Sequence, residues 1–206
     1  FPEYEKWHVT EKIDGTNIRV IYDGGDILFR GRKQRSQIPP KLYESLEETF
    51  LSKTKIFNEL FGQRTAILFG EGFGGYISGG TIPGEKYRDS CDFILFAVWT
   101  SDPSNQDSES PGIWANWEEV KEIAERLQIK VVPSLGIFNR EEAVQIVKRD
   151  MREGNITSKF GSFKPEGIVA TAHPFTLLDN GIPLRWKLKI ADYDRLEKWK
   201  EQEEKK

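Results

Sequence analysis

The hydrophobic pattern predicts short strands at the start of the chain. Apolar and β-branched residues dominate 9–13, 17–22 and 26–30, as they do in strands. Asp14-Gly15 follows the first segment, and Asp23-Gly24-Gly25 separates the second from the third. Because Asp-Gly and Gly-Gly sequences favour tight turns, we expect a strand and a turn, followed by a β-hairpin.

Helices are predicted where apolar residues recur at helical spacing. Over 41–60 this spacing predicts an amphipathic helix with a break close to its middle. Asn116 precedes Glu119 by three positions, and Asn139 precedes Glu142 by the same interval, which is a capping pattern of helix N-termini. An apolar stripe follows each pair, so each pair is expected to begin a helix.

The remaining pattern predicts a mixed fold. Apolar runs typical of strands lie at 65–69, 93–99, 168–171 and 184–189, loop-like segments at 72–84 and 101–112, and a charged helical tail at 193–206. Strands and helices therefore follow one another in an irregular order. That order indicates an α+β fold in which helices flank antiparallel sheets.

Composition excludes several classes of protein. The 206 residues suffice for one large domain or two small ones, and the net charge of −3 gives no global signature of nucleic-acid binding. A local basic segment lies at 30–35. Cys91 is the single cysteine, which excludes an internal disulfide and a cysteine-based zinc site. Without a membrane-length apolar run or a signal peptide, we expect an intracellular protein, in the cytoplasm of a cell or of a virus-infected host.

Candidate chemistry begins at Lys12, within the segment 10–17. The lysine stands two residues before the Asp14-Gly15 turn, at the expected end of a strand. A neutral lysine amine held there can act as a covalent nucleophile, and burial or nearby cations favour the neutral form. Most lysines beside turns are solvated surface residues, so this short motif alone leaves both interpretations open.

Four further short segments follow Lys12 in a particular order. They are Gly70-Glu71-Gly72, Asp-Phe-Ile-Leu-Phe at 92–96, Pro-Glu-Gly-Ile-Val at 165–169 and Arg-Trp-Lys-Leu-Lys at 185–189. In the last segment Lys187 and Lys189 alternate along one expected strand, so both project from the same face. Trp186 and Leu188 then point to the opposite, buried face, a pattern that solubility alone does not explain.

The ordered set of segments resembles the covalent nucleotidyltransferase superfamily of ATP-dependent DNA ligases, RNA ligases and mRNA capping enzymes. The sequence Glu-Lys-Ile-Asp-Gly-Thr-Asn at 11–17 is most similar to the RNA ligase 2 group. The resemblance runs from Glu11 to Lys189. It implies the nucleotidyltransferase (ATP-grasp-like) fold of a ligase catalytic domain. With few residues after Lys189, we expect one adenylyltransferase domain over 1–206 and no appended C-terminal domain.

The resemblance also implies catalytic and metal-binding roles. Lys12 would attack the α-phosphorus of ATP and carry AMP covalently. Lys187 and Lys189 would hold the α-phosphate and stabilise charge as pyrophosphate leaves. Glu166 and Glu71 would bind Mg²⁺ or Mn²⁺ together with phosphate oxygens and water.

A larger set of residues is expected to bind the nucleotide. Arginine forks suit phosphate and ribose recognition, and the basic segment leaves two candidates open, Arg32 and Arg35, of which Arg35 fits slightly better. Phe96 would stack on adenine, although a phenylalanine in an apolar strand is usually a core residue. The full nucleotide-binding set implied by the resemblance is Glu11, Ile13, Asn17, Arg32, Arg35, Glu71, Phe96, Glu166, Lys187 and Lys189.

The expected function is ATP-dependent RNA ligation, which joins 5′-phosphate and 3′-hydroxyl ends through a lysyl-AMP intermediate. The expected partners are ATP and RNA, in a nicked duplex or an RNA/DNA hybrid, in a setting of RNA repair and away from membranes. An ATP-dependent DNA ligase or a GTP-dependent capping enzyme is the alternative within catalysis. An inactive nucleic-acid-binding module is the alternative outside it.

Overall fold

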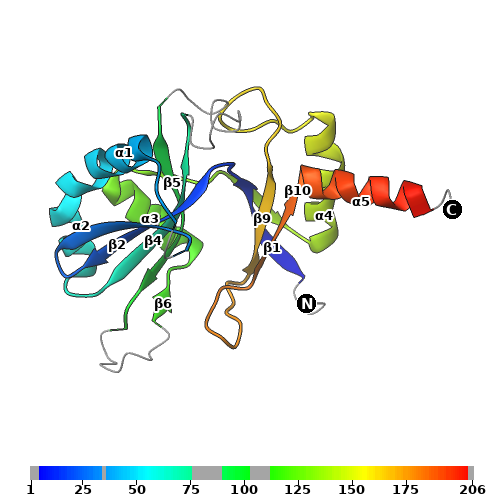
Figure 1. Cartoon of the computed structure of the whole chain (residues 1–206). Coiled ribbons are helices and arrows are strands. Elements are labelled where there is room, and N and C mark those ends of the chain that lie inside the picture. The colour runs from blue at the N-terminus through cyan, green and yellow to red at the C-terminus, as the bar shows by residue number, and fades with distance from the viewer. Residues whose placement is uncertain (1–4, 34–35, 76–89, 103–111, 204–206) are drawn as a thin grey trace. The chain divides into compact units, whose positions relative to one another are not determined.

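The computed structural model describes residues 5–33, 36–75, 90–102 and 112–203 (Figure 1). Its contacts divide the chain into two compact units, residues 14–131 and residues 1–13 together with 132–206. Both units combine helices with largely antiparallel sheets, which confirms the α+β prediction. The single domain expected over 1–206 stays a prediction, and each unit is described by itself.

The unit of residues 14–131 is built on a six-stranded sheet in the order β3-β2-β4-β5-β6, with β7 pairing β5. Its strands are β2 (Thr16–Asp23), β3 (Asp26–Gly31), β4 (Ala66–Phe73), β5 (Asp92–Thr100), β6 (Ile113–Trp114) and β7 (Lys130–Val131). The β5–β7 pair is parallel and the other pairs are antiparallel. Gly24 and Gly25 have φ angles of +59° and +134° in the β2–β3 turn, so the predicted hairpin is confirmed.

Helices cover one face of this sheet. They are α1 (Pro40–Phe50), a 3₁₀ turn (Leu51–Lys53), α2 (Thr54–Phe61) and α3 (Trp117–Leu127). The 3₁₀ turn is the break expected near the middle of 41–60, and the Asn116–Glu119 capping box begins α3 as predicted. Tyr22 stacks on Phe57 with ring centroids 5.5 Å apart, within an apolar core that joins β2, β4 and β5 to the helices.

The unit of residues 1–13 and 132–206 contains a four-stranded antiparallel sheet in the order β10-β9-β1-β8. Its strands are β1 (Lys6–Lys12), β8 (Ser134–Phe138), β9 (Gly167–His173) and β10 (Arg185–Lys189). The first strand begins three residues earlier than the pattern at 9–13 predicts. The sequence from 1–13 therefore supplies an interior strand, which lies between β8 and β9.

Two helical segments complete this unit, α4 (Arg140–Gln145) continued by a π turn (Ile146–Met151), and α5 (Ile190–Glu203). In Figure 1, α4 and α5 lie to the same side of the strands. The Asn139–Glu142 capping box begins α4 as predicted. Arg152 pairs with Asp194 and Glu197 at 2.7 and 2.9 Å, which ties α5 to the end of the π turn.

The two faces of the four-stranded sheet differ sharply. Trp7, Val9, Ile168, Ala170 and Ala172 point to one face and are at most 2% exposed. They pack against the apolar side chains of α4 and the π turn.

None of the helices among the described residues is long and apolar enough to cross a membrane.

Candidate active site

Strand register brings two of the predicted lysines into one row. Lys12 on β1 lies opposite Gly167 on β9, and Gly167 lies opposite Lys189 on β10. Neighbouring strands are about 4.8 Å apart, so the two lysines stand on either side of a residue that has no side chain. Gly167 has a φ of +155°, and a Cβ there would lie 2.1 Å from the carbonyl oxygen of Leu188. The row therefore requires glycine at its centre.

A single carboxylate joins the two lysines. The Nζ of Lys12 donates a hydrogen bond to Oε2 of Glu166, and the Nζ of Lys189 forms an ion pair with Oε1 of the same side chain. The side chains of Lys12 and Glu166 are only 17% and 15% exposed. Two ammonium groups share one carboxylate, so the cluster keeps a net positive charge and is suited to an anion such as phosphate.

Backbone contacts hold this cluster in place. Glu166 immediately precedes β9, and its carbonyl oxygen accepts a hydrogen bond of 3.0 Å from the amide of Ile190. Lys187 shares the face of Lys189 and is exposed, opposite Val169. Trp186 packs edge-on against Trp7 with centroids 5.8 Å apart, on the apolar side that the alternation predicts.

Glu11, the residue before the candidate nucleophile, is buried. Its side chain points to the apolar face of β1, is 2% exposed, and accepts hydrogen bonds from Oγ of Ser158 at 2.5 Å and from the amide of Lys159 at 3.0 Å. In this structure the carboxylate is thus used to hold the segment that leads to Glu166. Ile13 is also buried, at 3% exposure, and the nucleotide contacts expected of both residues stay predictions.

In the unit of residues 14–131, Asn17 and Glu71 lie directly opposite each other on β2 and β4. Both are partly exposed, on the face that the helices do not cover, because the neighbouring Ile18 belongs to the helix-packed core. A Cβ at Gly15 would lie 2.2 Å from the carbonyl oxygen of Gly72 and 3.0 Å from Cγ of Glu71. The Asp-Gly turn therefore packs directly on the Gly-Glu-Gly segment.

A bulge sets the position of Phe96. Phe69 pairs with Ala97 and Gly70 pairs with Leu95, so Phe96 is the extra residue of β5 at this point. It is partly exposed, whereas the residues on either side of it are buried. Because β-bulges redirect a side chain and are frequent beside active sites, this placement suits a base-stacking residue better than a regular strand position would.

Arg19, which was not among the predicted site residues, holds the start of the basic segment in place. Arg19 on β2 donates from Nε and Nη2 to the carbonyl oxygen of Gly31, at 3.2 and 2.8 Å, and from Nη2 to that of Arg32 at 3.5 Å. Arg19 stands two residues after Asn17 on the same strand, so both side chains project from the same face. This spacing could have identified Arg19 from the sequence. Arg32 is exposed, and the other candidate, Arg35, lies outside the described residues.

No group of three or more metal-ligating side chains gathers anywhere in the part of the chain that the structure describes. Magnesium needs only one or two carboxylates when phosphate oxygens and water complete its coordination. The Glu166 carboxylate is a hard oxygen donor of the required kind, so this residue fits a metal that arrives with a nucleotide. A metal site made of protein ligands alone does not fit these residues.

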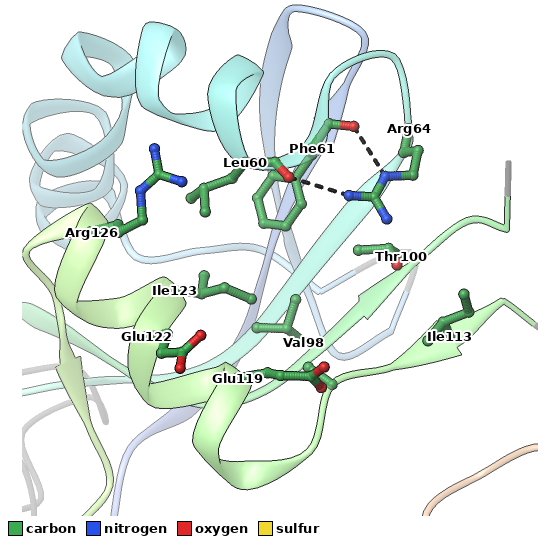
Figure 2. Close-up of a pocket in the computed structure, with 11 residues that line it drawn as sticks. Leu60, Phe61, Arg64, Val98, Thr100, Ile113, Glu119, Glu122, Ile123 and Arg126 are labelled. Atoms are coloured by element: carbon green, nitrogen blue, oxygen red, sulfur yellow. Dashed lines mark hydrogen bonds between the residues drawn. The ribbon is translucent and has the colours of Figure 1, made fainter.

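The residues of the cluster do not line the hollow drawn in Figure 2. This hollow of about 290 Å³ lies beside α2 and α3, and its floor includes Leu60, Val98 and Ile123. Its two arginines already have partners, because Arg64 donates to the carbonyl oxygens at the end of α2 and Arg126 pairs with Glu59 at 3.0 Å. The hollow therefore offers no free cation for a phosphate.

A model of the RNA ligase family matches residues 5–187. The match covers most of the chain and contains the first four segments of the predicted site, and it ends at Lys187, within the fifth. The chain belongs to the RNA ligase family. A search of curated protein sequences found no match.

Solved structures share the fold. A lysine-to-alanine variant of Naegleria gruberi RNA ligase with ATP and Mn aligns with a TM-score of 0.63 and 21% identity, over 92% of this chain and 50% of that one. The same ligase with pyrophosphate aligns with a TM-score of 0.64 and 21% identity, over 96% of this chain and 52% of that one. The chain thus spans about half the length of these relatives, and the likeness confirms the predicted nucleotidyltransferase type of fold.

Proposed function

We propose that this chain is an ATP-dependent RNA ligase or the adenylyltransferase part of one, with Lys12 as its nucleophile. The observation that carries the proposal is the cluster in which Glu166 joins Lys12 to Lys189. An amine, a second cation and a carboxylate are the groups that covalent nucleotidyl transfer to lysine requires. Membership of the RNA ligase family supports the same reaction.

In the first step, the Nζ lone pair of Lys12 attacks the α-phosphorus of ATP. A P–N bond forms, the bond from the α-phosphorus to the bridging oxygen breaks, and pyrophosphate leaves with that electron pair. The amine must be neutral when it attacks, so its proton passes to solvent or to a neighbouring base. Lys189 and Lys187 stabilise the charge that develops on the phosphate oxygens.

Two further steps complete ligation. An oxygen of an RNA 5′-phosphate attacks the phosphorus of lysyl-AMP, which forms a pyrophosphate-linked adenylate and returns the electron pair to Nζ. A 3′-hydroxyl oxygen then attacks the 5′-phosphorus, a phosphodiester forms, and AMP leaves. Glu166 and Glu71 are the residues that would hold Mg²⁺ or Mn²⁺, which would supply positive charge beside the phosphate oxygens.

The remaining binding residues act on the nucleotide in this proposal. Phe96 stacks on adenine, Asn17 and Glu71 bind the ribose or phosphates, and Arg32 or Arg35 binds a phosphate. The RNA ends lie in a nicked duplex or an RNA/DNA hybrid. A chain with one cysteine that uses ATP and RNA suits an intracellular setting.

The test is incubation with α-³²P-labelled ATP and magnesium, followed by a denaturing gel and peptide mapping. We expect label on Lys12 that pyrophosphate releases and that a chelator prevents from forming. A parallel incubation with α-labelled GTP distinguishes the capping reaction from ligation. Label on another residue, or none in a folded sample, would overturn the proposal, and label with GTP alone would move the chain to the capping enzymes.

The acceptor is tested separately from the first step. A pre-adenylylated strand supplied to unlabelled protein bypasses lysyl-AMP, and nicked substrates with RNA or DNA ends report the preferred strand. We expect sealing when the 3′-hydroxyl strand is RNA. Exclusive sealing of DNA ends would identify a DNA ligase instead.

A further inference from the structure

A third cation extends the row of lysines on β10. Arg185 stands two residues before Lys187 and four before Lys189 in the same strand, so all three side chains project from the same face. Arg185 lies opposite Thr171 on β9, and Thr171 lies opposite His8 on β1. None of these cross-strand neighbours is acidic, so the row around Arg185 offers its guanidinium no carboxylate.

Part of the Arg185 guanidinium is buried without a partner in the described part of the chain. Its Nε is buried and has no hydrogen-bond partner within the described part of the chain. Burial lowers the pKa of Arg185, because desolvation disfavours its charged form. A buried donor on a charged group is costly when it stays unpaired. A site with this cost is expected to have a ligand that removes it.

We propose that Arg185 is a phosphate-binding residue that contacts the backbone of the RNA strand. The inference rests on the proposed ligase function and adds a contact that the reaction at Lys12 does not need. Guanidinium forks bind phosphate oxygens through two parallel hydrogen bonds. Arg185 as a whole is partly exposed, so a ligand can reach it from the surface.

The distance between Arg185 and Lys189 along β10 indicates that the bound phosphate belongs to RNA and not to ATP. An antiparallel strand advances about 3.4 Å per residue, so four residues place Arg185 roughly 14 Å from Lys189 along β10. The phosphates of ATP are joined through single oxygens and must lie near Lys12 in the first step. A nucleic-acid strand carries a phosphate at every nucleotide and can extend along the row from Lys189 past Lys187 to Arg185.

The experiment compares Arg185→Ala with Arg195→Ala, which removes the same charge from a side chain that is 77% exposed. RNA binding is measured with a 5′-phosphorylated single strand over a range of salt concentrations. We expect Arg185→Ala to lower RNA affinity by about tenfold or more and to reduce the salt slope by about 0.7, the value for one phosphate on a single strand. Lysyl-AMP formation should stay at the wild-type level in both variants.

Stability provides a second measurement that does not depend on activity. Arg185→Met keeps much of the side-chain volume and removes the unpaired buried charge, so we expect a Tm at or above that of the wild type. A variant that is more stable yet binds RNA more weakly identifies a binding residue. Arg185→Lys should restore part of the RNA affinity, because it restores charge without the guanidinium fork.

Several results would overturn the inference. Unchanged RNA affinity in Arg185→Ala would show that the residue does not contact the strand. A raised KM for ATP with unchanged RNA affinity would assign Arg185 to the triphosphate instead. A lower Tm in Arg185→Met would indicate a structural role. Failure of the proposed function is distinguishable from all of these, because it appears as absence of lysyl-AMP in the wild-type protein.

Discussion

The two faces of the four-stranded sheet differ in chemistry, although the same strands form both. On one face, Trp7 and Ala170 pack into an apolar core and are at most 1% exposed. On the other, Lys12 and Lys189 share the carboxylate of Glu166. Alternation along each strand separates the two faces. The apolar face therefore supplies the rigidity with which the polar face can hold like charges together.

Glu11 is the exception that connects the faces. It belongs to the apolar face, but it is a carboxylate, and its hydrogen bonds to Ser158 and Lys159 fix the segment that ends at Glu166. Glu11, the neighbour of the proposed nucleophile Lys12, thus holds the segment leading to Glu166 from the opposite face of the sheet. A residue beside a site residue in a strand faces away from the site, yet it can still position a group that belongs to the site.

Lys12→Ala should give the largest functional effect with a smaller structural effect. The substitution removes the amine proposed to form the P–N bond, so we expect complete loss of label from α-labelled ATP. Because Lys189 still pairs with the largely buried Glu166, the free energy of unfolding should fall by no more than about 1–3 kcal/mol. Both are measured on the same sample, by gel and by thermal unfolding. Lys198→Ala, at an exposed site on α5, is the matched control and should label normally.

Trp7→Ala should give the converse result. Removing a buried tryptophan from the apolar face is expected to cost about 3–5 kcal/mol of stability, which urea unfolding measures. Trp199→Ala, at a tryptophan that is 58% exposed, should change stability by less than about 0.5 kcal/mol. Equal losses in the two variants would contradict the assignment of the core.

Gly167→Ala should damage both faces together. The added Cβ would meet the carbonyl oxygen of Leu188 at 2.1 Å and would adopt an unfavourable φ, so we expect a loss of about 1–3 kcal/mol and slower lysyl-AMP formation. Gly154→Ala separates the causes, since Gly154 has a φ of +85° but no atom near its added Cβ. If Gly154→Ala slowed labelling as much, the close approach of β9 and β10 would not be the reason.

The smallest effect is expected from Glu11 and Ser158, which lie on the opposite face of the sheet from the proposed nucleophile. Glu11→Gln and Ser158→Ala should each slow lysyl-AMP formation, and the double variant should lose less than the sum, with a coupling of about 0.5–3 kcal/mol. The KM for ATP should stay unchanged if the carboxylate acts by holding its segment. A raised KM in Glu11→Gln alone, with Ser158→Ala silent, would show that Glu11 contacts the nucleotide directly.

Much of the fold followed from local pattern, because its signals lie within a few residues of one another. The hairpin at Asp23-Gly24-Gly25, the capping box at Asn116 and the alternation of Lys187 with Lys189 are examples. The short strands β6 and β7 have only two residues each, too few to show a period. β8 was missed because its Gly136, with a φ of +132°, interrupts an apolar run of only five residues.

The order of the short motifs predicted which residues form the site. The sequence could not predict how these residues are arranged in space. Nothing local to Gly167 indicates that it must stand between two lysines, because that depends on the register of three strands. The contact of Glu11 with Ser158 joins residues 147 positions apart, and the bulge at Phe96 depends on β4. Arg185 stands two residues before Lys187, so the sequence alone places both side chains on the same face of the strand. Only the structure shows that the Nε of Arg185 is buried.

The interior position of β1 has a consequence for how the protein is made. The strand that carries Lys12 leaves the ribosome before residues 14–131, yet both of its partner strands are encoded after them. Long-range pairing of this kind slows folding, because a long loop must close before any contact forms. During synthesis, residues 14–131 can form their own core before the partner strands of β1 are made. Until then the apolar side chains of β1 have no strand to pack with. Pulse proteolysis of stalled nascent chains should therefore find 14–131 protected before β1, and Lys12 should acquire its neighbours on β9 only after that.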